Sequence, residues 1–167
     1  MSETQASQRV AFWSTASALP EDVFAVWRKP DAAITPVAIV ATTDADGAPR
    51  TAPFGSLRAV TPQLLRLACW CGHDTYANLR RGARLSVALM CHNSAVSVIG
   101  SPRVVREHME ADEQFAIVDI DVEEVKNDMV YRIVIESGIE IAAREKYKLW
   151  YDAAMQELDA LGQLPRT

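Results

Sequence analysis

The chain has 167 residues, 49% of them apolar, and a formal net charge of −5. This size and balance are typical of one folded domain and exclude a disordered chain. The negative charge and the dispersed arginines argue against a nucleic-acid partner, because phosphate binding needs a clustered basic surface. No segment approaches the roughly 18 uninterrupted apolar residues of a membrane span, and residues 1–20 lack the pattern of a secretory signal.

The three cysteines, Cys69, Cys71 and Cys91, are an odd number in a chain without a recognisable signal. We therefore expect free thiols in a reducing compartment, and hence a cytoplasmic protein with no membrane partner. We expect a single domain over residues 1–167. Residues 1–19 should be flexible, and residues 139–167 should form a C-terminal helix and tail.

The first predicted element is a short helix over 20–28. Pro20 suits its first position, Glu21 and Asp22 favour its positive end, and Pro30 ends it. From Pro36 the period changes, and a strand is predicted over 37–43, followed by a turn at Asp44-Ala45-Asp46-Gly47.

The returning strand, predicted over 48–60, contains Pro49 and Pro53. Two prolines cannot both donate to a ladder, so we expect an edge, a bulge or an unpaired stretch that another group can bind. Further along the chain, the pattern predicts strands over 64–70, 85–91, 95–106, 117–125 and 130–136, with helices over 74–81 and 143–161.

Two patterns within these elements bear on function. Arg66 lies on the face of its strand opposite the apolar row Leu65, Leu67 and Cys69. Asp119, Asp121 and Glu123 alternate with apolar residues, which predicts a solvated acidic face. In the last helix Tyr147, Trp150 and Tyr151 share a stripe that favours packing or a dimer interface over a substrate site.

The succession of hairpins predicts a mainly β protein with flanking helices. We expect an antiparallel, Greek-key-type barrel of about six strands, split rather than fully closed, with a long C-terminal helix.

Two segments, Asp46-Gly47-Ala48-Pro49-Arg50-Thr51-Ala52-Pro53-Phe54 and Asp74-Thr75-Tyr76-Ala77-Asn78-Leu79-Arg80-Arg81-Gly82-Ala83-Arg84-Leu85-Ser86-Val87, carry a likeness to a known family. Their order and spacing resemble the FMN-binding split barrels that include pyridoxamine 5'-phosphate oxidase. The resemblance implies a homodimer with cofactor sites at the interface, FMN as cofactor, and oxidoreductase chemistry on a small organic substrate.

The residues offer a matching site. A helix opening at His73, Asp74 and Thr75 presents free amides for a phosphate, which Arg50 and Arg66 could bind. The backbone of Thr51 to Phe54 could bond the ring edge, and Trp70 could flank it. The expected cofactor-binding residues are Arg50, Thr51, Ala52, Pro53, Phe54, Arg66, Cys69, Trp70, His73, Asp74, Thr75 and Asn78, with no evident catalytic acid or base.

Plainer roles stay open for several of them. Arg50 and Arg66 could be ordinary ion-paired side chains, Asp74 a helix cap, and Asn78 a packing residue. A zinc site or a nucleophilic cysteine built on Cys69, Cys71 and His73 has weaker support.

The chain also departs from the family pattern. Pyridoxamine 5'-phosphate oxidases carry a Ser-Arg-Lys phosphate triplet where this chain has His73, Asp74 and Thr75; Cys69 replaces a threonine and Ala95 a glutamine. These differences argue against pyridoxamine 5'-phosphate as substrate. They leave open deazaflavin or FAD as cofactor, a non-catalytic flavin, deazaflavin or haem carrier, and a cofactor-free dimeric protein.

Overall fold

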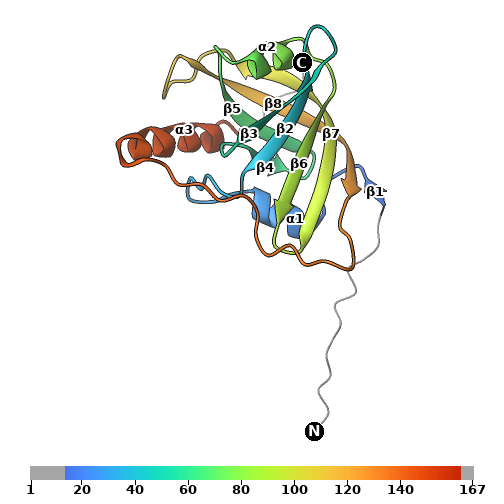
Figure 1. The fold of residues 1–167 in the computed structure, drawn as a ribbon. Coiled ribbons are helices and arrows are strands. Elements are labelled where there is room, and N and C mark those ends of the chain that lie inside the picture. The colour runs from blue at the N-terminus through green and yellow to red at the C-terminus, as the bar shows by residue number, and fades with distance from the viewer. Residues whose placement is uncertain (1–13, 163–167) are drawn as a thin grey trace.

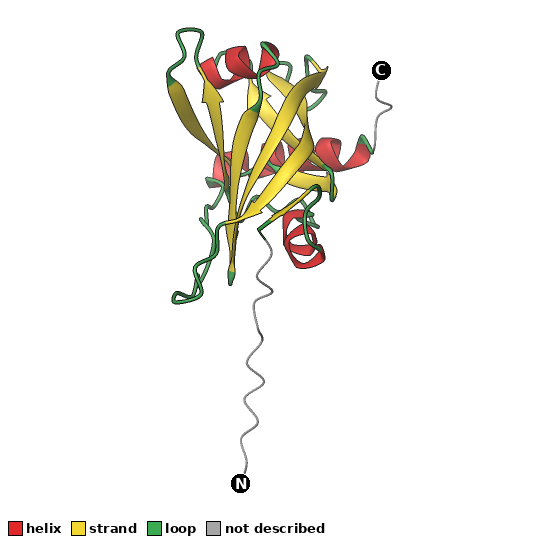
Figure 2. Cartoon of the chain, turned by 90° about the vertical axis from the view of Figure 1, so that its right-hand side faces the viewer, coloured by secondary structure: helices red, strands yellow, loops and turns green. Residues whose placement is uncertain are grey.

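The computed structural model describes residues 14–162, in which a curled antiparallel sheet carries helices on its outside (Figures 1 and 2). The strands are β1 (Thr15–Ala16), β2 (Ala38–Thr43), β3 (Pro49–Phe54), β4 (Arg58–Thr61), β5 (Leu64–Trp70), β6 (Leu85–Cys91), β7 (Ser94–Arg106) and β8 (Phe115–Asn127). The helices are α1 (Glu21–Trp27), α2 (Asp74–Arg80), a 3₁₀ turn η1 (Glu145–Tyr147) and α3 (Lys148–Ala160). The predicted fold class, mainly β with flanking helices and a C-terminal helix, is confirmed.

The sheet nearly closes on itself. Its strand order is β3-β2-β6-β7-β8-β5-β4, with β1 paired to β8. The two ends of this order, β3 and β4, follow each other in the chain with only residues 55–57 between them. The two edges therefore meet at a short turn without a ladder between them, which makes a split barrel.

The barrel interior holds one apolar core, and helix α3 creates another outside it. Alternating residues of the central strands, such as Val40, Val87 and Val118, point inward and are fully buried. Ala68 and Ile117 point outward from β5 and β8 and pack against α3. Strand β5 is thus buried on both faces over residues 64–69.

The helices lie close to their expected positions, although α3 begins at Lys148 rather than at residue 143, and β1 was not predicted. Helix α1 confirms the segment 20–28, and in Figure 1 it lies at the opposite end of the sheet from α2. Residues 1–13, most of the segment expected to be flexible, lie outside the described residues, as do 163–167. Within the remainder Thr15 and Ala16 pair with β8, and Leu19 is buried. The flexibility expected of this segment stays a prediction.

Two strand predictions need correction. The segment 48–60 is broken by the turn at 55–57 into β3 and β4. The segment 130–136 is not a strand; it belongs to an extended loop that carries one bridge, Ile139 to Val37. The backbone of this segment contacts the turn between β6 and β7, where the Asn93 amide donates to the Ile135 carbonyl at 2.9 Å and His92 Nδ1 lies 3.1 Å from the Glu136 carbonyl, and a turn offers no ladder for a further strand.

No helix within residues 14–162 has the length and apolar character needed to cross a membrane.

Candidate functional site

A cleft of about 320 Å³ opens between the free edge of the sheet and helix α3. Its lining comes from β3 and the following turn, from the end of β5, from the α2 cap, from β8 and from α3. These residues are Ala52, Pro53, Phe54, Gly55, Ser56, Ala68, Cys69, Trp70, His73, Phe115, Trp150, Tyr151 and Met155.

Strand β3 forms one side of the cleft because it is an end strand. Among the described strands it pairs only with β2, where Pro53 lies opposite Ile39. The backbone on its other side has no ladder partner, as its two prolines predicted. This edge offers main-chain hydrogen-bonding groups toward the cleft.

Aromatic side chains form the opposite side. The Trp150 ring lies 4.7 Å from Phe115 at a 53° tilt and 4.9 Å from Tyr151, edge to face. Trp150 Nε1 donates to Asp112 Oδ2 at 3.0 Å, which fixes the indole in place. These geometries are favourable for aromatic pairs, so the wall is held in one arrangement.

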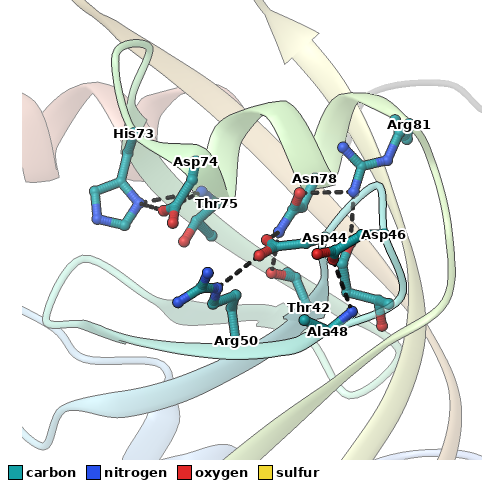
Figure 3. A network of polar contacts seen from close by, with 11 residues as sticks. Thr42, Asp44, Asp46, Ala48, Arg50, His73, Asp74, Thr75, Asn78 and Arg81 are labelled. Atoms are coloured by element: carbon teal, nitrogen blue, oxygen red, sulfur yellow. Dashed lines mark hydrogen bonds and ion pairs between the residues drawn. The ribbon is translucent and has the colours of Figure 1, made fainter.

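A polar network beside the cleft joins the first hairpin to α2 (Figure 3). Asp44 accepts from Arg50 Nε at 2.6 Å and from Asn78 Nδ2 at 2.9 Å. The hydrogen bonds from Arg50 and then Asn78 hold the pKa of Asp44 below its usual value, and Asp44 in turn raises the pKa of Arg50. Asn78 also donates to Thr42 at 2.9 Å, and Arg81 donates to Asn78 Oδ1 at 2.6 Å.

Helix α2 begins with a shared cap. His73, rather than Asp74, holds the N-cap position, and its Nδ1 accepts from the Thr75 amide at 3.1 Å. Asp74 Oδ1 accepts from the same amide at 2.8 Å and lies 2.7 Å from His73 Nδ1. The expectation that Asp74 caps the helix is therefore correct only as a shared role, since both side chains compete for one donor.

Arg66 does not reach the cleft, contrary to the prediction. Its side chain is fully buried and bonds Asp119 at 2.7 and 3.1 Å and the Leu158 carbonyl at 3.1 Å. The acidic face expected to be solvated is equally wrong at Asp119, which has no exposed surface. Helix α3 covers Arg66 and Asp119, so these two charges lie beneath the helix and pair there, whereas Asp121 and Glu123, further along β8, stay partly exposed.

The other predicted residues divide into two groups. Ala52, Pro53, Phe54, Cys69, Trp70 and His73 line the cleft, whereas Arg50, Thr51, Asp74, Thr75 and Asn78 are not among its lining residues. In Figure 3 Arg50 extends from β3 toward the start of α2, near Thr75.

The cysteine alternatives find no support in this geometry. The three cysteines are free thiols, as expected. Burial raises the pKa of Cys69 to about 12, which keeps it protonated and unreactive at neutral pH. Among the described residues no group of His, Cys, Asp and Glu is arranged to hold a metal ion.

Sequence reasoning missed part of the wall. Phe115 and Met155 were not singled out, and Trp150 and Tyr151 were assigned to packing or an interface. Their stripe spacing was visible, but nothing in the sequence showed that α3 would dock beside β3 and the end of β5.

No family model matches the chain, and no curated protein matches it. Solved structures do share its fold. A Lactobacillus delbrueckii protein provisionally assigned as a pyridoxamine 5'-phosphate oxidase is 21% identical, with a TM-score of 0.56 over 68% of this chain and 98% of its own. An F420 reductase is 11% identical, with a TM-score of 0.52 over 65% of this chain and 98% of its own.

An FMN-binding protein from Syntrophomonas wolfei is 10% identical, with a TM-score of 0.50 over 66% of this chain and 89% of its own. At such identities the likeness establishes the split-barrel fold, and the functions of these proteins remain theirs.

Proposed function

We propose that this chain binds a flavin-type cofactor in the cleft and uses it for oxidoreductase chemistry on a small organic molecule. One observation carries the proposal: a split barrel, a fold used by an FMN-binding protein, has in this chain an aromatic-walled cleft beside a free strand edge. FMN is the form that the sequence resemblance implies.

The cleft fits a planar ring system. Its volume lies at the lower end of the range of small-molecule sites, and its walls are mostly apolar and aromatic. Phe54 and Trp70 would face the ring from the barrel side, and Trp150 from the α3 side. The free backbone edge of β3, from Thr51 to Phe54, would hydrogen-bond the polar rim of the ring.

A bound flavin would supply the hydride or electron transfer, and the protein would supply orientation and exclusion of water. The aromatic wall would exclude water because it is apolar. It would also orient the ring, because Trp150 is held by its hydrogen bond to Asp112 and cannot rotate away without losing that bond. No side chain of the cleft is assigned as a general acid or base.

We also propose that the chain works as a homodimer with its cofactor sites near the interface. The loop after β8 exposes four large apolar side chains, with Tyr131 at 68% and Val134 at 67% exposure, and Val130 and Ile133 at half or more. A second copy that covers this loop would remove that surface from water. Light scattering of Tyr131→Glu/Val134→Glu should then report a monomer where the native chain is a dimer.

The first test is the absorption spectrum of the purified protein and its titration with FMN. Near-stoichiometric flavin absorbance is expected, and Trp150→Ala should weaken binding about five- to tenfold, the scale of one lost aromatic contact. Leu149→Ala is the matched control, since Leu149 precedes Trp150 in α3 but is 84% exposed. Absence of binding to any flavin would refute the proposal.

Turnover separates the enzyme from a carrier. Steady oxidation of a nicotinamide cofactor with an artificial acceptor supports the oxidoreductase. Tight flavin binding without turnover would instead favour the carrier.

A further inference from the structure

We propose that this cleft recognises its flavin by the ring alone, so that riboflavin, with its uncharged tail, binds at least as tightly as phosphorylated FMN. The inference rests on the proposed function and narrows its ligand class. It follows from the charged groups that line the cleft and from those that lie around it.

The cleft itself offers no fixed cation. Among its described lining residues there is no Lys, Arg, Asp or Glu, and the Cys69 thiol is protonated. Phosphate sites in proteins depend on charge-assisted hydrogen bonds, most often from arginine. A phosphate inside this cleft would lose its water without gaining such a partner.

The one lining residue that can become cationic, His73, is paired with a carboxylate. Its Nδ1 lies 2.7 Å from Asp74 Oδ1. If the imidazole is protonated, the pair has no net charge; if it is neutral, the pair carries the charge of Asp74. In neither state does this end of the cleft present a net positive charge to an anion.

Two buried cations contact the cleft wall from behind, and both are bonded to other groups. Lys29 Nζ donates to the Gly55 carbonyl at 2.9 Å, and Arg58 donates to the Ser56 carbonyl at 3.2 Å and is paired with Asp159 at 2.8 Å.

Arg50, on β3, is also compensated. Its Nε donates to Asp44 at 2.6 Å, its side chain is 57% exposed, and Asp74 and Asp46 act on it as further anions. Arg81 donates to the Thr43 carbonyl and to Asn78 within the same network. An exposed, paired arginine contributes little to binding.

Arg66, the β5 arginine that was expected to bind a phosphate, is bonded to other groups. Arg66 is fully buried between Asp119 and the C-terminal end of α3. A dianionic tail that leaves the cleft beside His73 would therefore meet Asp74 and compensated arginines. Ring contacts remain as the source of affinity, and they are the same for riboflavin and FMN.

The experiment titrates the full chain, freed of any bound flavin, with riboflavin and with FMN at about 0.05 and 0.5 M salt. Flavin and tryptophan fluorescence report binding, since Trp70 and Trp150 line the cleft. We expect riboflavin to bind at least as tightly as FMN, and FMN affinity to stay level or rise with salt as repulsion is screened. FMN affinity reproducibly above that of riboflavin at low salt, with the difference lost in high salt, would overturn the inference and leave the proposed function standing.

A charge-reversal variant sharpens the test. Asp74→Lys should raise FMN affinity about two- to fivefold and leave riboflavin affinity unchanged, since an exposed charge pair contributes up to about 1 kcal/mol. Glu124→Lys makes the same charge change nine positions beyond Phe115 on β8, about 30 Å along the strand, and should change neither affinity. Equal FMN affinity in Asp74→Lys and the native chain contradicts the inference. If neither flavin binds to the native chain, the proposed function itself is refuted.

Discussion

Removal of Asp119 should strongly destabilise this protein. Both oxygens of its carboxylate bond the Arg66 guanidinium, at 2.7 and 3.1 Å, and neither side chain has exposed surface. Breaking a buried pair from one side costs about 3–5 kcal/mol, because the remaining charge stays buried without compensation. Asp119→Ala is therefore expected to lower the free energy of unfolding by about 3–5 kcal/mol.

The Leu158 carbonyl does not replace the lost partner. It already accepts from Arg66 at 3.1 Å, and a neutral carbonyl cannot balance the charge. Arg103 also donates to Asp119, at 3.2 Å, but it is partly exposed and keeps a contact to Asp121 at 3.3 Å. The penalty therefore arises mainly at Arg66.

Urea unfolding followed by tryptophan fluorescence measures the effect. With an m-value of about 2 kcal/mol per molar, the midpoint should fall by roughly 2 M. The double variant Arg66→Met/Asp119→Leu removes both charges and should recover most of the loss. Arg103→Met is the control on the partly exposed side, with an expected loss below about 1 kcal/mol.

The reasoning would be refuted if Asp119→Ala lost less than about 1 kcal/mol, or if the double variant were as unstable as the single one. If Asp119→Ala does not fold at all, the comparison of the double variant with the native chain still decides the matter.

Three further predictions concern other buried groups. Asn78→Ala should lower the free energy of unfolding in urea by about 1–3 kcal/mol, because it leaves Thr42 without its amide partner and removes the bond between α2 and Asp44 of the hairpin. A loss no larger than that of the exposed Arg50→Ala would contradict this. Burial, with Arg58 nearby, lowers the pKa of Lys29 to about 7, so between about pH 7 and 10.4 the unfolded chain binds more protons at this site than the folded one. The stability of the native chain relative to Lys29→Met should therefore rise from pH 7 to pH 10, and a flat difference would count against the shift. At pH 8 iodoacetamide should label Cys71 well before Cys69, whose thiol is buried with a pKa of about 12; peptide mass spectrometry that finds Cys69 labelled first would reverse the assignment.

The sequence was informative wherever a local rule determines structure. The two prolines of β3 predicted an edge, a bulge or an unpaired stretch, of which the structure shows the edge. The Asp-Gly turn after Asp44 predicted the first hairpin. The α2 segment was equally readable, from its polar start at His73 to the stop at Gly82. These features depend on residues close together in the chain, so period and turn chemistry are enough to predict them.

The errors concern what lies above each strand. Alternation correctly placed Arg66 and Asp119 on the outer face of their strands, but it could not show that α3 would cover that face. Arg66 bonds Leu158, which is 92 residues away along the chain, and Asp119, which is 53 away. No periodicity within one element contains that information. The cleft's aromatic wall was missed for the same reason.

The packing of α3 against the sheet also determines how far the chain could be shortened without loss of stability. Three of the solved structures that share its fold align with only 65–68% of the chain, which suggests a shortened version that lacks the last helix. Yet Arg58 donates to Asp159 at 2.8 Å, and Arg66 to Leu158, so two guanidinium groups of the sheet have partners at the end of this last helix. A shortened chain would inherit both cations without those acceptors. Although α3 lies outside the barrel, it supplies acceptors for two buried cations of the sheet, so the barrel depends on this helix for its stability.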